Sequence, residues 1–241
     1  ERSLEISRRH PDVEPFKRIG ALAILELASE TGGFLLGDKA PVTPEDLNRA
    51  ADDMKAIAEH FLEIGFADEH DLVASINNAA MLLRLSGRHS ECAALLERGL
   101  PIALEDLSLR RFLALAQAAD GQRTEALATL AAADDDPESQ LLSAQFTAAD
   151  DPPAALAGAL AIDGAVLSAH LSRMRWNIIG DMALMTGDTQ SLNAAIEGMR
   201  ELDPADVTAN LLEIRGKHRA GLADEAVQER LRGLVSALPP E

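Results

Sequence analysis

The sequence predicts an all-α protein, and three observations support this fold class. Apolar residues make up 47% of the chain but aromatic residues only 3%, so the apolar content is mainly Ala and Leu, which favour helices. Runs of β-branched residues with period-two alternation, which would predict strands, are absent. Glycines recur at a set interval: the separation between Gly87 and Gly121 is the same as that between Gly187 and Gly221. We therefore expect a helical protein built from repeated units.

Residues 1–68 predict one helix pair that carries no repeat motif. A polar lead-in at 1–13 precedes apolar residues at helical spacing, which predict a helix over 14–30. A segment rich in Gly and Pro at 31–43 predicts a loop. A helix-start pattern of Thr, Pro and two acids then precedes an apolar stripe, which predicts a second helix over 44–64.

From Glu69 onward the predicted helices come in pairs. Each of the four recurring glycines marks a turn between two helices, and a further turn is expected at Asp150–Pro153. After three of the glycines a Glu is followed by a small residue, as in Glu91-Cys92, which permits close packing of the two helices. The predicted pairs span 69–103, 106–133, 137–162, 164–202 and 204–238.

The stretch from Trp176 to Pro204 carries the clearest motif. It contains Trp176-Asn177-Ile178-Ile179-Gly180, then Gly187-Asp188, and closes with Asp203-Pro204. This layout resembles the tetratricopeptide (TPR) repeat, with Ile179 where that family has Leu and Ala183 where it has Tyr, and the interval between the glycines equals the period of that repeat. Residues 77–83 and 95–98 are similar to the TPR variety of kinesin light chains and bacterial signalling proteins.

The resemblance covers about residues 69–238 and implies a right-handed α-solenoid of stacked antiparallel helix pairs, a TPR-like superhelix. It divides the chain into an N-terminal helical pair with its lead-in at 1–68 and a single continuous repeat array at 69–241. Trp176 is expected to be buried between the helices of its pair. Cys92, the only cysteine, is expected to be a small buried thiol.

Charge and hydropathy exclude several classes of partner. The formal net charge of −18 disfavours nucleic acid and anionic membrane surfaces, which need Lys and Arg. No apolar run is long enough to span a bilayer, so we expect no membrane insertion. We expect a cytoplasmic location. Because the chain does not begin with Met, it is either processed or a fragment of a longer protein. We expect the fragment, with further domains on the same polypeptide as possible partners.

Motifs for catalysis or metal binding are not found. The sequence has no phosphate-binding loop and no His-Glu-x-x-His, and its six histidines are scattered. Glu69-His70-Asp71 is better explained as a solvated helix start, because adjacent helical residues point apart. We expect no enzyme activity, no cofactor and no metal site.

In TPR-like arrays the first helix of each pair lines a groove, and this resemblance nominates the site residues by their offset from each turn. The candidates are Asn77, Arg84, Arg111, Asn177, Asp181 and Arg215. The same offsets also give Met81, Leu115, Ala118, Gln140, Ala144, Thr147, Leu184, Leu211 and His218. The three arginines suit a peptide that bears carboxylates, because Arg pairs with carboxylate bidentately. The alternative is that these positions form ordinary solvated helix faces.

A second surface competes with this groove. No Lys or Arg lies between Arg123 and Arg173, a stretch that includes Asp134, Asp135 and Asp136. Its acids serve either to keep the turns soluble or to dock a basic segment.

The leading function hypothesis is a non-catalytic scaffold that binds a protein or peptide partner. The alternative is a regulatory or sensor region of a larger multidomain enzyme, such as a signalling NTPase or a glycosyltransferase. A small-ligand domain is a third option, which the low aromatic content disfavours.

Overall fold

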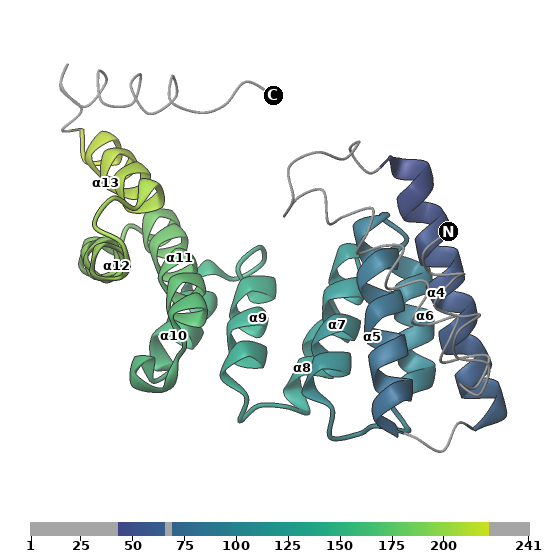
Figure 1. Cartoon of the computed structure of the whole chain (residues 1–241). Helices are drawn as coiled ribbons and strands as arrows, with labels where there is room; N and C mark the ends of the chain where they lie inside the picture. Colours follow the sequence, from purple (N-terminus) through teal and green to yellow (C-terminus); the bar gives the residue numbers. More distant parts are fainter. Residues whose placement is uncertain (1–42, 66–68, 222–241) are drawn as a thin grey trace. The chain divides into compact units, whose positions relative to one another are not determined.

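A computed structural model describes residues 43–65 and 69–221. Within these residues the protein consists of ten α-helices and one short 3-10 helix, with no strand (Figure 1). The α-helices are α4 (Pro44–Ile64), α5 (Glu69–Leu85), α6 (His89–Gly99), α7 (Leu107–Ala119), α8 (Arg123–Ala131), α9 (Pro137–Thr147), α10 (Pro152–Ala161), α11 (Ala169–Thr186), α12 (Thr189–Leu202) and α13 (Val207–Arg219), and η1 (Gly164–Val166) precedes α11.

The predicted all-α class and the predicted helices from 44 to 219 are confirmed in this part of the chain. The turn between α9 and α10 falls before Pro152, as the sequence indicated. One boundary differs, because α11 begins at Ala169 rather than near 164. Ser168 accepts a hydrogen bond from the backbone N–H of Leu171 and starts the helix there. The helices expected at 14–30 and beyond Gly221, together with the lead-in and loop, lie outside the described residues.

The predicted turn glycines all adopt backbone conformations that favour glycine. Gly87, Gly121, Gly187 and Gly221 have φ values of 73°, 83°, 81° and 71°. Each follows the end of a helix, and at Gly187 this residue is the left-handed C-cap of α11. A side chain would be strained at such φ values, so the regular spacing of glycine has a conformational cause.

The chain divides into two compact units, residues 1–129 and residues 130–241, with the boundary inside α8. Each unit is described by itself below. The division expected from the sequence, between residues 68 and 69, stays a prediction.

In the first unit, consecutive helices from α4 to α7 lie side by side around one core. The core is built mainly of Leu, Ile and Ala side chains, with Met54, Phe61 and Cys92 fully or almost fully buried among them. Arg88, just before α6, forms ion pairs with Asp52 of α4 at 2.7 Å and with Glu91 at 2.7 Å. Lys55 of α4 also pairs with Glu91 at 2.6 Å, so these charges join α4 to α6.

In the second unit, consecutive helices from α9 to α13 pack against one another, and α11 also contacts α9 and α13. The surroundings of Gly180 explain why the motif that begins at Trp176 has a glycine at this position. A Cβ there would overlap the side chain of Leu212 on α13 and would lie 3.5 Å from Cβ of Ala195 on α12. Three helices meet at this residue, and only a residue without a side chain allows the approach.

Trp176 is not buried as predicted but half-buried. One side of its indole packs against Gly198 of α12, where a Cβ would overlap the ring. The guanidinium of Arg175 lies 4.6 Å from the centroid of the ring. Trp176 therefore lies at the edge of the α11–α12 interface, where a cation covers part of the ring in place of apolar side chains.

Candidate functional site

Helix capping explains part of the acidic stretch that was expected to compete as a docking face. Asp136, Asp151 and Asp163 cap the starts of α9, α10 and η1, and each accepts a hydrogen bond from a backbone N–H in the first turn. Asp106, Asp188 and Asp206 do the same for α7, α12 and α13. Among the three consecutive acids, only Asp134 and Asp135 remain exposed without a capping role.

The groove positions predicted in the first unit lie on α5 and α7. Asn77 donates a hydrogen bond through Nδ2 to Oγ of Ser108 at 3.0 Å, while its Oδ1 is buried and unpaired within the described residues. The guanidinium of Arg84 lies 5.6 Å from the ring centroid of Phe112. Arg111 is half-buried. Asn77 thus links the first helices of two consecutive pairs and is only in part available to a ligand.

Two exposed apolar residues lie beside Arg84 on α5. Met81 is 39% exposed and Leu85 is 62% exposed. They are one helical turn apart and therefore share one face of the helix. Leu115 and Ala118 on α7 are half-buried. This face of the first unit combines apolar side chains with a cation.

Three of the predicted positions in the second unit come together around one hollow. Asp181 and Leu184 of α11 and Arg215 of α13 line it, together with Met182, Met185 and Arg219, and its volume is about 500 Å³. We call this site the α11–α13 hollow. It lies between the first helices of two consecutive pairs, which is where the resemblance placed a groove.

The charges of the α11–α13 hollow differ in how firmly they are held. Arg215 and Asp181 are 3.9 Å apart, and their side chains are 68% and 58% exposed. Arg219 donates hydrogen bonds to the carbonyl oxygens of Leu184 and Met185 at the end of α11, so its guanidinium is already used. Met185 is 54% exposed and supplies an apolar surface. Arg215 is therefore the cation that a ligand can recruit most easily here.

Sequence reasoning missed Met185 and Arg219. Each lies one helical turn after a residue that was nominated, Asp181 and Arg215 respectively, and extends the same stripe of its helix. Nominating in addition the residue one helical turn further along each first helix, toward its turn glycine, would have found both.

Several other nominated residues do not belong to an open groove. Ala144 is buried in the core of the second unit. Thr147 donates a hydrogen bond to the carbonyl oxygen of Ser143, and Gln140 donates one to the carbonyl oxygen of Asp134. Asn177 is half-buried, and its Oδ1 has no partner within the described residues. Of these residues, Gln140, Ala144 and Thr147 lie on α9, which packs against both α10 and α11.

Cys92 and the acidic and histidine side chains are the remaining groups in the described residues that could carry chemistry. Burial raises the pKa of the Cys92 thiol to about 11, and Sγ donates a hydrogen bond to the carbonyl oxygen of Ala80. A thiol with so high a pKa is a poor nucleophile at neutral pH. Among the described residues no group of three His, Cys, Asp or Glu side chains is arranged to hold a metal ion. No described helix has both the length and the hydropathy needed to cross a membrane.

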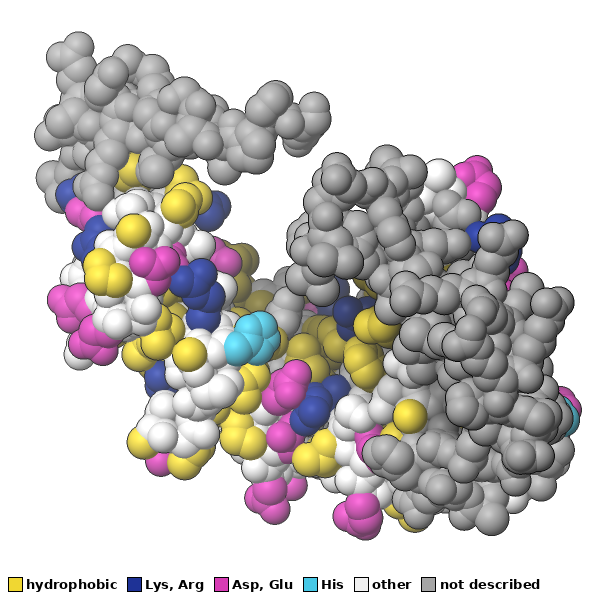
Figure 2. Space-filling view, viewed as in Figure 1, with side chains coloured by type: hydrophobic (Ala, Val, Ile, Leu, Met, Phe, Trp, Pro, Cys, Tyr) yellow, Lys and Arg dark blue, Asp and Glu magenta, His cyan; other side chains and the backbone are white. Residues whose placement is uncertain are grey.

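Acidic, basic and hydrophobic side chains are interspersed on the visible surface of α11 to α13, without a large patch of one sign (Figure 2). Comparison with known proteins gives no assignment: no family model matches the chain, and no curated protein matches it.

Proposed function

We propose that this chain is a non-catalytic, TPR-like interaction module, and that the α11–α13 hollow binds an extended protein segment. The observation that carries the proposal is the composition of this hollow. An exposed Met185 lies beside Asp181 and Arg215, whose mutual ion pair is loose and solvated.

The loose pair matters energetically. An exposed ion pair contributes only about 0–1 kcal/mol, so the protein loses little when Arg215 exchanges Asp181 for a carboxylate of the ligand. Burial of Met185 under an apolar side chain adds a favourable term of about 25 cal/mol per Å² of apolar surface removed from water. The preferred segment therefore has an acidic residue close to an apolar one.

The first unit offers related chemistry on α5, where Arg84 follows the exposed Met81 by one helical turn, precedes the exposed Leu85 and lies over the ring of Phe112. The same combination of exposed apolar side chain and arginine thus occurs on the first helices of two different pairs. This repetition supports binding through first helices, as the TPR resemblance implies.

The test is selection from a random peptide library displayed on phage, followed by affinity measurements with the recovered peptides. We expect peptides with adjacent acidic and apolar residues. Arg215→Ala and Met185→Ala should each weaken binding by about tenfold or more, because residues at the centre of an interface dominate its free energy. Arg98→Ala, an exposed arginine in the first unit, is the matched control and should change affinity by less than about twofold.

Two outcomes would contradict the proposal. The first is a library from which nothing is enriched. The second is enrichment of basic peptides whose binding survives Arg215→Ala but is lost when Asp134 and Asp135 are both changed to Lys. That second result would move the binding site to the acidic stretch.

A further inference from the structure

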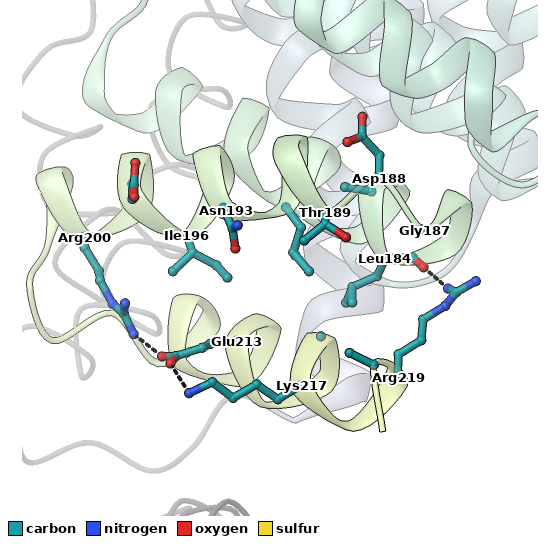
Figure 3. Close-up of a pocket in the computed structure, with 15 residues that line it drawn as sticks. Leu184, Gly187, Asp188, Thr189, Asn193, Ile196, Arg200, Glu213, Lys217 and Arg219 are labelled. Carbon is teal, nitrogen blue, oxygen red and sulfur yellow. Dashed lines mark hydrogen bonds and ion pairs between the residues drawn. The ribbon is translucent and has the colours of Figure 1, made fainter. Parts of the chain in front are cut away.

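Three of the four arginines on α11 and α13 contact the end of another helix. Arg175 donates hydrogen bonds to two carbonyl oxygens in the last turn of α10. Arg219 donates hydrogen bonds to the carbonyl oxygens of Leu184 and Met185 in the last turn of α11, and Figure 3 shows its guanidinium directed toward Leu184. Carbonyl groups in the last turn of a helix have no partner within that helix, and the helix dipole attracts a cation there. Arg219 therefore joins α13 to the end of α11.

Arg173 of α11 joins the same two helices at the start of α13. Nη2 of Arg173 lies 2.8 Å from Oδ2 of Asp206 and 3.6 Å from Oδ2 of Asp203. Asp206 caps α13, because its Oδ1 accepts a hydrogen bond from the backbone N–H of Ala209, and its side chain is only 3% exposed. A buried carboxylate is costly unless a cation and hydrogen bonds compensate it. Arg173 thus provides a cation that the capping aspartate needs.

These two contacts lie on either side of the α11–α13 hollow. Along α11, Asp181 lies after Arg173 and before the carbonyl groups that Arg219 binds. Along α13, Arg215 lies after the capping aspartate and before Arg219. Asp181 and Arg215 form the loose ion pair of the hollow. The distance between the two helices at this pair is therefore fixed from both directions.

The first unit joins its first helices at the equivalent position. Asp106 caps α7 as Asp206 caps α13. Ser108 donates a hydrogen bond to Asp106 and accepts one from Asn77 of α5. A polar side chain of one first helix again reaches the capping aspartate of the next, here through Ser108. This repetition supports a role of such contacts in the spacing of first helices.

We propose that Arg173 and Arg219 are positioning residues of the α11–α13 hollow, which hold α11 and α13 at the spacing that a ligand meets, while Arg215 contacts the ligand. The spacing exists without a ligand, whereas its effect on affinity rests on the proposed function. A site whose helices are already held at the bound spacing spares the ligand the cost of ordering them.

Paramagnetic relaxation enhancement in the ligand-free full chain tests the spacing. A nitroxide is attached at Thr208→Cys, an exposed position in the first turn of α13, and amide relaxation is measured in α11. Cys92 does not compete for the label, because it is buried and the pKa of its thiol is raised to about 11. Arg173→Met should weaken the enhancement over residues 170–177. Arg173→Lys should restore it, because lysine keeps the cation.

A second label tests Arg219, and Arg200 of α12 provides the matched control. With a nitroxide at the exposed position His218→Cys, Arg219→Met should weaken the enhancement in the last turn of α11. Arg200 also joins two helices, because it donates a hydrogen bond to Glu213 of α13 at 2.6 Å, but it does not join the two first helices (Figure 3). Arg200→Met should leave both enhancements as in the wild type. Unchanged enhancements in Arg173→Met and Arg219→Met, or an equal loss in Arg200→Met, would refute the positioning role.

The effect on affinity is measured with library-selected peptides. Arg173→Met should weaken binding by about threefold to tenfold, because part of the binding free energy must then order the two helices, and Arg173→Lys should restore it. The dependence of Kd on salt should stay as in the wild type, whereas Arg215→Ala should flatten it, since Arg215 pairs with a charge of the ligand.

Two results with these peptides would overturn the positioning role. One is wild-type affinity in Arg173→Met, and the other is a salt dependence flattened as in Arg215→Ala, which would make Arg173 a ligand contact. A library that yields no peptide would contradict the proposed function, and the relaxation measurements would then decide the role of the two arginines in spacing.

Discussion

At the scale of single residues, glycine serves two different purposes in this chain. Gly187 has a φ of 81°, and a Cβ there would meet nothing within 4 Å, so its role is conformational. Gly158 lies inside α10, and a Cβ there would lie 3.7 Å from Cβ of Ala144, which is an ordinary contact. These two glycines therefore respond oppositely to the same substitution.

We predict that Gly187→Ala lowers the free energy of unfolding by about 1–2 kcal/mol, the usual cost of a left-handed non-glycine residue. Gly158→Ala should raise it by about 0.5–1 kcal/mol, because glycine inside a helix is destabilising relative to alanine. Urea unfolding of the two variants measures both values. Equal effects of the two substitutions would contradict this account of the turns.

Glu213 gives a pH-dependent prediction. Hydrogen bonds from Lys217 and then Arg200 lower the pKa of its carboxyl to about 2. A depressed pKa in the folded state means that the stabilisation is fully present above the unfolded pKa and is lost as the pH falls through about 2. We expect Glu213→Gln to destabilise the protein by about 1 kcal/mol at pH 7, after allowance for solvent screening, and progressively less below pH ~4.

The measurement is urea unfolding of wild type and Glu213→Gln across this pH range. Glu201→Gln, at an exposed position of α12, is the matched control. A difference between wild type and Glu213→Gln that stays constant down to pH ~2 would show that the carboxylate does not contribute through its charge.

Some residue roles followed from the sequence and others did not. The turn glycines and the buried Cys92 were predicted, because local conformation and residue size determine them. The capping aspartates were seen only as acidic turns, although Asp136-Pro137 and Asp151-Pro152 are strong helix-start patterns. The partial exposure of Trp176 could not be predicted, since it depends on where Arg175 lies and on how closely α12 approaches.

At the scale of helices, the contact of Trp176 with Gly198 determines how closely α11 and α12 pack. We predict that Gly198→Ala destabilises the protein by about 1–3 kcal/mol, because a Cβ would overlap the indole and force it aside. Gly158→Ala is again the control, as the same chemical change in a helix without such a neighbour.

A double-mutant cycle identifies the indole as the cause. In a Trp176→Leu background, Gly198→Ala should cost at least about 1 kcal/mol less than in the wild type, because the smaller side chain leaves room for the new methyl group. Chemical denaturation of the four proteins measures the coupling. An additive result would show that Gly198 is required for some reason other than the approach of Trp176.

Helix existence was predictable along the described chain because apolar periodicity and turn glycines are local signals. The pairing of helices was expected from the resemblance to TPR units, and the helix contacts fit it for α5 with α6, α9 with α10 and α11 with α12, but not for α7 with α8. The division into two compact units within α8 was not foreseen, since nothing in the composition of residues 123–131 marks a boundary.

At the scale of the whole molecule, the net charge of −18 has a local as well as a global meaning. Six aspartates in the described residues cap helix starts, so part of the acidity serves secondary structure and not a partner. The charge remains unfavourable for binding to nucleic acid. Each exposed arginine, such as Arg215, is therefore a local positive charge on a protein whose net charge is negative.

The sequence predicted which residues of the candidate site meet only where they lie on the first helices of two adjacent pairs. Asp181, Leu184 and Arg215 meet because equal offsets on adjacent first helices bring residues to the same face. Asn77 and Asn177 were nominated by the same rule, but their Oδ1 atoms are buried. This burial depends on how closely neighbouring helices pack, which the spacing of residues in the sequence does not predict.

The most direct test of the central claim, that first helices bind a protein segment, is an amide chemical-shift map of the full chain with a library-selected peptide. The account predicts that the largest shift changes fall on α11 and α13 around Asp181, Met185 and Arg215, and that Arg215→Ala removes them. Shift changes concentrated on α12, or on the loop that carries Asp134 and Asp135, would contradict it.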